Sequence, residues 1–236
     1  MDFESPLRCG ILLRRYKRFL ADIVGETGEQ LTLHCPNPGA MSGCTDPGSR
    51  VWYSRSSNSA RKYAHTLEIV ESLQGDLVGV NPGRANAIVD EAIRDGRVRV
   101  AGMSAVTIHR EVPIPGERGR FDFRLDGTDG AACFIEVKSV TLLRERGLGA
   151  FPDARSDRAR RHAIALQRLG EAGHRAMMLF CVQHAGVTRV TIADDIDYEY
   201  GVAVRAAYRA GVGVIAYRTV ITPQQLVLAE EIPVEL

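Results

Sequence analysis

The first 80 residues alternate apolar and polar side chains in short runs, as half-buried strands do. Glycine and proline gather between these runs, for example at Pro36, Pro38 and Gly39, and mark turns. Short strands at this spacing predict a small β-barrel or sandwich, a class to which the OB-fold belongs. The expected strands cover residues 10–13, 19–24, 30–34, 50–54 and 66–71.

The pattern changes after the turn Asn81-Pro82-Gly83. Apolar residues recur at helical spacing over residues 86–95, and Gly96 follows as a stop signal. The order helix, three strands, helix, strand, helix, strand predicts an α/β domain around a mixed sheet. We therefore expect two domains, residues 1–82 and 83–236. The further strands are expected at residues 105–112, 120–125, 132–140, 176–183 and 213–218, the later helices at 156–172 and 198–210, and an extended tail at 226–236.

Two of these strands, residues 120–125 and 132–140, are joined by Asp-Gly dipeptides and are typical of a β-hairpin. If the hairpin pairs about Asp129, Asp122 lies directly across from Glu136 on one face of the sheet. Opposed residues have Cβ atoms roughly 4.5–5.5 Å apart, so two carboxylates at these positions can share one cation. A slip of one residue would put them on opposite faces.

Two carboxylates this close repel each other unless a positive charge lies beside them. Mg²⁺ is suited to this role, because it binds one or two carboxylates and keeps its other positions for water and phosphate oxygens. Lys138, on the same face as Glu136, would then hold the water that attacks a phosphodiester. Only three of the 30 Lys and Arg residues are lysines, which hints that a compact ammonium group is needed here. A solvated face with cross-strand ion pairs is the other interpretation, and the residues leave both open.

The composition is that of an ordinary globular protein, with 236 residues, 45% hydrophobic and 25% charged. No run of about 18 apolar residues occurs, so we expect no membrane-spanning helix. The first residues lack the basic and apolar regions of a signal peptide. The five cysteines are odd in number and show no zinc-type spacing. These features predict a cytoplasmic protein with reduced thiols.

Positive charge gathers in two segments, although the formal net charge is only +1. Residues 8–18 and 50–62 carry basic side chains and no acidic residue. Such stripes fit the phosphate backbone of nucleic acid, and the interleaved Tyr16, Trp52 and Tyr63 offer stacking surfaces for unpaired bases. A solvated basic surface over core aromatics is the alternative. The residues expected to contact DNA in these stripes are Arg14, Arg15, Lys17, Arg18, Arg50, Arg61 and Lys62.

Motifs along nearly the whole chain resemble those of a known family. An Asp on the middle strand and Glu-x-Lys on the third, within the order helix, three strands, helix, strand, resemble the PD-(D/E)XK nuclease-like superfamily. The whole chain is similar to the sugar fermentation stimulation protein A family. The segments that carry this resemblance are RRYKRFLAD (14–22), HCPN (34–37), Gly39, MSGC (41–44), GSRVW (48–52), RKY (61–63), GVN (79–81), EVKSVTL (136–142) and FPDA (151–154).

The resemblance implies an N-terminal OB-like nucleic-acid-binding β domain, followed by a restriction-endonuclease-like α/β domain with a mixed central sheet. It also implies DNA binding and a link to the regulation of sugar utilisation. By similarity, Asp122, Glu136 and Lys138 take the catalytic positions, with Mg²⁺ or Mn²⁺ as the cofactor. Asp122, Glu136 and Glu91 are the expected metal ligands, although an ordinary exposed glutamate is the alternative for Glu91.

The chain departs from the family pattern in two respects. Pro38 and Pro82 stand where relatives usually have Thr or Ser after Asn, and proline removes both a backbone donor and a hydroxyl. The helix that begins at Ser156 or Asp157 is also more basic than usual. Its Arg158, Arg161 and His162 are expected on one helical face, where the two arginines would contact DNA near the metal or form a solvated surface.

Two functional hypotheses follow. In the first, the protein binds DNA and its nuclease-like domain keeps a metal-dependent phosphodiesterase site. In the second, it is a non-catalytic DNA-binding regulator that keeps the fold without cleavage. The sequence leaves open whether the DNA is single- or double-stranded. Cleavage of both strands of a duplex would need two sites, as a homodimer supplies.

Overall fold

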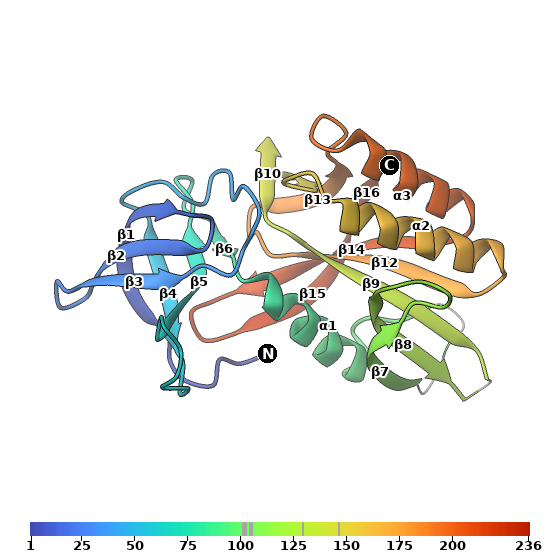
Figure 1. Cartoon of the computed structure of the whole chain (residues 1–236), viewed down its shortest axis with the longest axis horizontal. Coiled ribbons are helices and arrows are strands. Elements are labelled where there is room, and N and C mark those ends of the chain that lie inside the picture. The colour runs from blue at the N-terminus through green and yellow to red at the C-terminus, as the bar shows by residue number, and fades with distance from the viewer. Residues whose placement is uncertain (101–102, 104–105, 129, 146) are drawn as a thin grey trace.

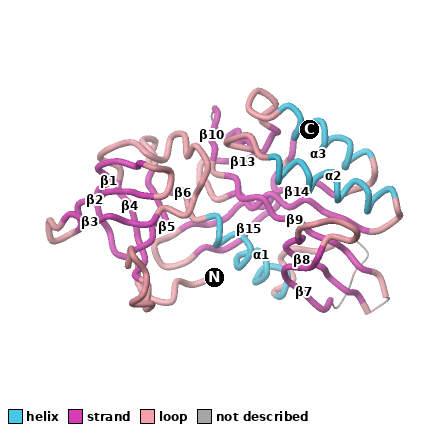
Figure 2. Tube along the Cα trace, in the orientation of Figure 1, coloured by secondary structure: helices cyan, strands magenta, loops and turns pink. Residues whose placement is uncertain are grey.

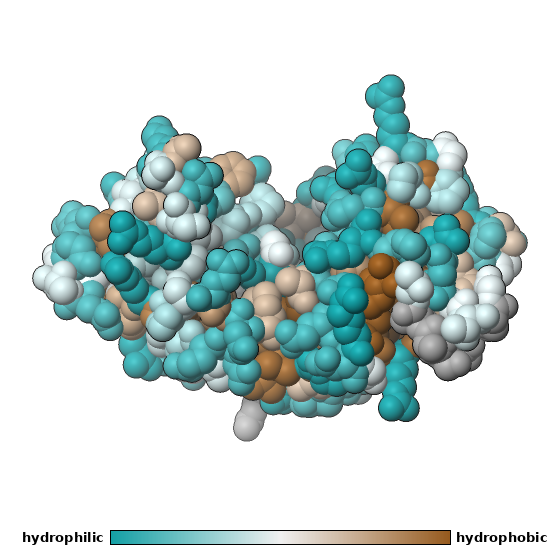
Figure 3. Space-filling view, turned by 90° about the horizontal axis from the view of Figure 1, so that it is seen from below, coloured by the Kyte–Doolittle hydropathy of each residue, from teal (hydrophilic) through white to brown (hydrophobic). Residues whose placement is uncertain are grey.

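The computed structural model describes residues 1–236 except 101–102, 104–105, 129 and 146. A small β-barrel and a larger α/β domain lie side by side along the longest axis of the molecule (Figure 1). Seen from below, a notch separates the two domains, and hydrophilic side chains cover most of this face of the barrel (Figure 3). None of the helices formed by the described residues is long and apolar enough to cross a membrane.

Five antiparallel strands and one short parallel contact make the N-terminal barrel. The pairing order is β3-β2-β1-β4-β5, and a pairing of His34 with Thr66 joins β3 to β5 and closes the barrel. The alternating pattern predicts a barrel or a sandwich, and the structure has the barrel, which is also what the family resemblance implies. The short β6, which the sequence analysis missed, adds to the edge of β5. The strands are β1 (Arg8–Tyr16), β2 (Leu20–Gly25), β3 (Gln30–His34), β4 (Arg50–Arg55), β5 (His65–Glu71) and β6 (Leu77–Gly79).

Inward-facing apolar side chains fill the barrel, because every second residue of each strand points to its interior. Leu12, Ile23, Leu33, Tyr53 and Leu67 are fully buried there. A turn of 3-10 helix, η1 (Pro82–Arg84), then leads into α1 (Ala85–Arg94). Pro82 stands at the first position of η1, where a missing N–H costs nothing, and the Asn81 side chain accepts from the N–H of Gly83.

A six-stranded mixed sheet forms the centre of the second domain, in the order β15-β14-β12-β9-β8-β7. Strands β14, β12 and β9 are parallel to one another, and β15, β8 and β7 pair antiparallel, so the sheet is mixed, as predicted. Residue 105, the expected start of the first strand, lies outside the described residues. The strands are β7 (Val106–Pro113), β8 (Arg120–Gly127), β9 (Ala132–Val140), β12 (Arg175–Val182), β14 (Gly213–Ile221) and β15 (Leu226–Ile232).

Helices cover both faces of this sheet (Figures 1 and 2). The helices α2 (Asp157–Glu171) and α3 (Tyr198–Arg209) pack together over one face, and α1 packs on the other. Strand β12 has apolar residues on both faces: Met178 and Phe180 contribute to the core under α2 and α3, Met177 and Leu179 to the core under α1. A strand covered on both faces gives the continuous apolar run seen in the sequence.

A second, four-stranded sheet packs beside the first and was absent from the sequence analysis. Its order is β10-β11-β13-β16. Its strands are short, and the segment of β10 and β11 is rich in glycine and arginine. These strands therefore show no clear alternation of apolar and polar residues from which they could be predicted. They are β10 (Leu142–Glu145), β11 (Gly147–Phe151), β13 (Val187–Ile192) and β16 (Val234–Glu235).

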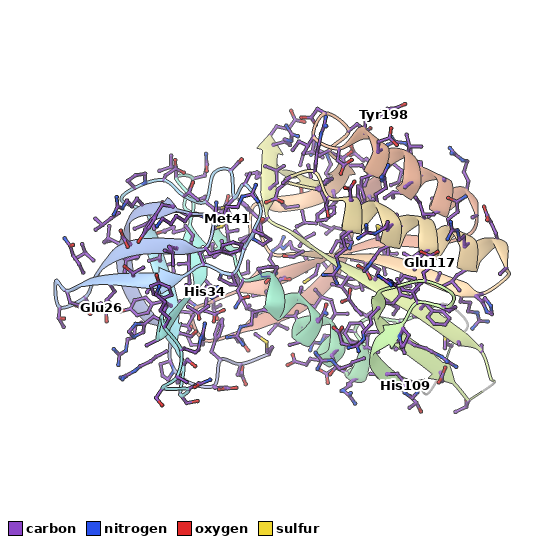
Figure 4. The ribbon with its side chains drawn as sticks, in the orientation of Figure 1. Glu26, His34, Met41, His109, Glu117 and Tyr198 are labelled. Atoms are coloured by element: carbon purple, nitrogen blue, oxygen red, sulfur yellow. The ribbon has the colours of Figure 1, made fainter. Side chains whose placement is uncertain are left out.

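Backbone contacts join the two domains. The N–H of Gly79 donates to the carbonyl of Gln183 over 2.9 Å, and the N–H of Ala185 donates to the carbonyl of Leu77 over 3.0 Å. On the loop after β3, the N–H of Met41 lies 3.4 Å from a carboxylate oxygen of Asp153, and Met41 lies on the side of the barrel that faces the α/β domain (Figure 4). These contacts set the barrel against the sheet that carries Asp122 and Glu136.

All five cysteines are free thiols, as the sequence predicts. Burial raises the pKa of Cys44, Cys133 and Cys181 to about 12. These three thiols are therefore protonated near neutral pH and act as small apolar core residues.

Candidate active site and nucleic-acid surface

The β8–β9 hairpin has the register that the sequence predicts. Phe123 pairs with Ile135 and Arg124 with Phe134, and the paired residues end there, next to Asp122 and Glu136. Asp129, about which the pairing was expected to centre, lies outside the described residues. The two carboxylates therefore come from neighbouring strands, just beyond the last paired residues. Asp122 contacts Asn86 of α1 and Glu136 contacts His162 of α2, helices that cover opposite faces of the sheet, so the expectation that both side chains share one face is corrected.

Glu136 is buried, with an exposed fraction of 3%, and two basic side chains contact one of its oxygens. Lys138 Nζ donates to Oε1 over 2.5 Å, and His162 Nδ1 lies 2.6 Å from the same oxygen. The other oxygen, Oε2, is buried and has no hydrogen-bond partner in the described structure. A buried carboxylate oxygen without a partner is costly unless water or a cation reaches it.

Asp122 is held by donors from two different elements. The backbone N–H of Val137 donates to Oδ2 over 2.7 Å, and Asn86 Nδ2, on α1, donates to Oδ1 over 2.8 Å. These bonds orient the carboxylate without neutralising it. No basic side chain among the described residues lies within hydrogen-bond distance of Asp122, and the buried Glu136 carboxylate is near it.

The pKa values of the two carboxyl groups shift in opposite directions. Burial and the charge of Glu136 raise the pKa of Asp122, against the bonds from Val137 and Asn86. Burial also acts to raise the pKa of Glu136, but His162 and Lys138 outweigh it and the net pKa is lowered. Glu136 is therefore ionised, and its charge is what makes ionisation of Asp122 unfavourable. A divalent cation between them would relieve both costs.

The structure does not bring Glu91 to this pair of carboxylates. Its carboxylate forms ion pairs with the amino group of Met1 at 2.6 Å and with Arg97 at 2.9 Å. Five positions along a helix turn the side chain about 140° away from that of Asn86, which faces Asp122. The expectation of Glu91 as a metal ligand is corrected by this geometry. Within the described part of the chain, no group of three His, Cys, Asp or Glu side chains is arranged to hold a metal.

His162 is the contact that the sequence analysis misplaced. It was expected on one face of α2 with Arg158 and Arg161. In the structure it lies on the buried face of α2, whereas both arginines are exposed. The signal was present in the helix, because Ala159, His162, Ala163 and Leu166 form its buried stripe. A histidine on the apolar stripe of an amphipathic helix points to the core. Asn86 was missed because nothing in the sequence joins it to Asp122.

On the barrel, the basic residues divide into paired and unpaired ones. Arg14 bonds to Asp22 over 2.9 Å and Arg50 forms a bidentate pair with Glu71, so both charges are partly offset. Lys17 and Arg18 form the exposed tip between β1 and β2, with φ of 49° and 62°. Phe19 beside them is 46% exposed. In the loop between β4 and β5, Arg61 and Lys62 are exposed as well.

Arg15 is bonded to the backbone of the barrel itself. Its guanidinium donates to the backbone carbonyls of Arg18, Asn37, Gly39 and Ala40 over 2.8–3.3 Å. With its terminal nitrogens bonded in this way, the side chain clamps the β1–β2 turn to the loop after β3. Arg15 is therefore a structural residue of the barrel, and its contact with DNA stays a prediction.

Family models match most of the chain, and known proteins match its whole length. The family model for the SfsA N-terminal OB domain matches residues 13–80, and that for the sugar fermentation stimulation protein RE domain matches residues 83–225. Sugar fermentation stimulation protein homologues of Teredinibacter turnerae and Shewanella loihica are 48% and 46% identical, over 100% of both chains. The structure of Pyrococcus furiosus SfsA in complex with Ca²⁺ is 24% identical with a TM-score of 0.86, and the match covers 100% of this chain and 98% of that one. The predicted fold class is confirmed.

Proposed function

This chain belongs to the sugar fermentation stimulation protein family, and on that premise we propose that it binds DNA and cleaves it at a metal-dependent phosphodiesterase site. The observation that carries the proposal is the pair of half-buried Asp122 and buried Glu136. The two carboxylates lie on neighbouring strands, near enough for the charge of Glu136 to raise the pKa of Asp122, and Glu136 Oε2 has no protein partner among the described residues.

The donor set fits a hard divalent cation. Asp122 and Glu136 would hold Mg²⁺ or Mn²⁺, and two carboxylates leave positions for water and for a phosphate oxygen. The Pyrococcus furiosus relative was solved with Ca²⁺, which like Mg²⁺ prefers oxygen ligands and so supports this assignment. When bound, the cation lowers the pKa of a coordinated water and offsets charge on the scissile phosphate.

The protein's own groups supply the rest of the site. Lys138 and His162 both hold Glu136 Oε1, so Oε2 is the oxygen left for the cation. Lys138 is close enough to this carboxylate to hold the attacking water as well. Asn86 and the N–H of Val137 fix the orientation of Asp122. Exposed Arg158 and Arg161 of α2 would contact the DNA backbone beside the site.

The barrel would bind the DNA strand through two loops. In OB-folds, the face of the second and third strands and the loops that join strand 1 to 2 and strand 4 to 5 bind oligonucleotides. Here these loops carry Lys17, Arg18, Arg61 and Lys62, with Phe19 exposed between them as a stacking surface. The stripes of positive charge thus gather on the part of an OB barrel suited to nucleic acid.

Incubation with Mg²⁺ or Mn²⁺ tests cleavage. We expect the protein to degrade single- or double-stranded DNA in the presence of the metal and to lose this activity in a chelator. Gel analysis of labelled single- and double-stranded DNA and RNA identifies the substrate. If none is cut with either metal although DNA still binds, the chain is the non-catalytic DNA-binding regulator, acting in the control of sugar utilisation.

Salt dependence tests the binding surface. Each phosphate contact contributes about 0.7 to the slope of log affinity against log salt for single strands and about 0.9 for duplex. Replacing both Lys17 and Arg18 with Gln is therefore expected to flatten the slope by about 1.4 or 1.8, measured by fluorescence anisotropy. Arg209→Gln is the control. It removes one positive charge from an exposed position of α3, and it is expected to leave the slope unchanged. A steep slope that survives the double substitution would remove this loop from the interface.

A further inference from the structure

A polar pocket of about 320 Å³ opens at the edge of the barrel where the chain passes into the second domain. Residues from the end of β3, from β4 and β5, and from η1 line it. His34, one of them, lies at the edge of the barrel that faces α1 (Figure 4). No residue of the Asp122–Glu136 pair takes part. The volume is in the range of sites that hold small ligands.

The floor of the pocket is a buried carboxylate whose hydrogen bonds are all satisfied. Glu68 is 1% exposed and accepts from Ser54 Oγ at 2.7 Å and from Asn81 Nδ2 at 2.9 Å. Arg84 donates to both of its oxygens, at 2.7 and 3.0 Å. This fixed carboxylate holds the guanidinium of Arg84 in one orientation. The Phe3 ring centroid lies 5.6 Å from the guanidinium carbon of Arg84. The Nη1 atom of Arg84 makes no hydrogen bond to the described residues.

The walls add positive charge and hydroxyl groups. Arg55 and Arg61 are exposed and form no ion pair within the described structure, and Arg61 lies 3.4 Å from His34 Nδ1. Burial and Arg61 lower the pKa of His34, so its ring is neutral at pH 7. Ser54, Ser56 and Thr66 supply hydroxyls, and Glu4 at the mouth is the one further acid. Three guanidinium groups thus face two carboxylates, one of which is already saturated by its donors.

A neighbouring pocket adds one more arginine to these basic and hydroxyl groups. Its volume is about 500 Å³; it shares Arg55, Ser56 and Ser57 with the first pocket and adds Arg8. Guanidinium forks beside hydroxyl donors match the oxygens of a phosphate dianion better than a single carboxylate, because phosphate offers three oxygens to separate donors. From this arrangement we propose that the pocket binds a phosphomonoester, carried on the end of a nucleic-acid strand or on a free nucleotide.

The pocket is tied to the candidate active site by α1. Arg84 holds the floor of the pocket, and Asn86, two residues later, holds Asp122. A strand end bound in the pocket would therefore be fixed relative to the two carboxylates by one short rigid segment. This strand-end form rests on the proposed function, whereas binding of a free nucleotide does not.

Binding without metal separates the pocket from cleavage. The full chain in a chelator is titrated against a labelled single strand that ends in a phosphate or in a hydroxyl. The terminal phosphate is expected to strengthen binding about tenfold, the size of one or two charged hydrogen bonds. Arg55→Ala is expected to reduce this preference below about threefold. Arg209→Ala removes an equal charge from an exposed position of α3, and it is expected to leave the preference for the terminal phosphate unchanged.

Competition identifies the source of the phosphate. A nucleoside 5′-monophosphate that cancels the preference at micromolar concentration marks the free nucleotide as an occupant, and a preference that persists marks the strand end. Equal affinity for both strand ends, with no competition by the monophosphate or by inorganic phosphate, would overturn the proposal, as would a preference that Arg55→Ala leaves intact. If no strand binds, DNA binding fails, and calorimetry with the monophosphate on wild type and Arg55→Ala decides the pocket alone.

Discussion

Asp122→Asn is expected to abolish metal-dependent cleavage while leaving the protein at least as stable as the wild type. Loss of a metal-binding carboxylate removes several kcal/mol of transition-state stabilisation, which corresponds to about 10³-fold or more in rate. The stability effect has the opposite sign. The pKa of Asp122 is raised in the folded protein by burial and by Glu136, so its ionised form costs free energy at neutral pH.

A neutral amide removes that cost and keeps the main contacts. The side-chain oxygen of Asn can still accept from the N–H of Val137, and a rotated Asn86 amide can accept from the new amide nitrogen. A gain of about 1 kcal/mol would raise Tm by about 2–4 °C in a protein of this size. Thermal melts in a chelator and cleavage rates with Mg²⁺ measure the two effects separately.

Asp126→Asn on the same strand is the matched control. Asp126 is half-buried and pairs with Arg124 at 2.7 Å, away from Glu136. This variant is expected to cleave like the wild type and to gain no stability. A large loss of stability in Asp122→Asn would show that Asp122 serves the fold, and full activity would exclude it as a metal ligand.

Lys138→Met is expected to destabilise the protein strongly when no metal is present. The side chains of Lys138 and Glu136 are only 11% and 4% exposed, and removal of the lysine leaves the carboxylate with His162 alone. Breaking a buried ion pair in this way costs about 3–5 kcal/mol. In a chain of this length that lowers Tm by roughly 10 °C, and it is measurable by urea unfolding in a chelator.

The second substitution Glu136→Gln separates charge from packing. If the loss comes from an uncompensated carboxylate, the double variant Glu136→Gln/Lys138→Met is expected to regain most of the stability. The difference between the single and double variants gives the coupling energy of the pair. A double variant as unstable as Lys138→Met would contradict the electrostatic account and assign the loss to packing of the lysine stem.

These two expectations distinguish a functional pair from an ordinary ion pair. An ordinary pair stabilises the fold and is weakened when either member is neutralised. Asp122 instead has no basic partner within hydrogen-bond distance among the described residues, and both of its bonds come from neutral donors. A group that destabilises the fold in its ionised form is typical of a binding or catalytic site.

The sequence was most informative where local rules decide the structure. Alternation and turn residues predicted the barrel strands, and Asp-Gly dipeptides predicted the hairpin and its register, in which Phe123 pairs with Ile135. Helical spacing and capping residues predicted α1, α2 and α3, with Ser156 capping α2 through the N–H of Ala159. The motifs along the chain led to the family that the comparisons confirm.

The sequence did not predict contacts between elements that lie far apart in the chain. Arg15 was counted with the DNA surface, yet it clamps loops of the barrel. Glu91 was expected at the metal, yet α1 presents Asn86 to Asp122. The short strands β10, β11 and β13 form only because they find partners in one another.

The sequence alone therefore determined most elements of the barrel and of the main sheet and the register of the hairpin, because each depends on residues close in the chain. Only the tertiary structure decided that His162 reaches Glu136, that Oε2 is left unpaired and that Glu68 builds a pocket around Arg84. Those features depend on the rotation of each helix against the sheet and on which polar groups are buried together. Such choices are set by the packing of the whole core rather than by any local pattern.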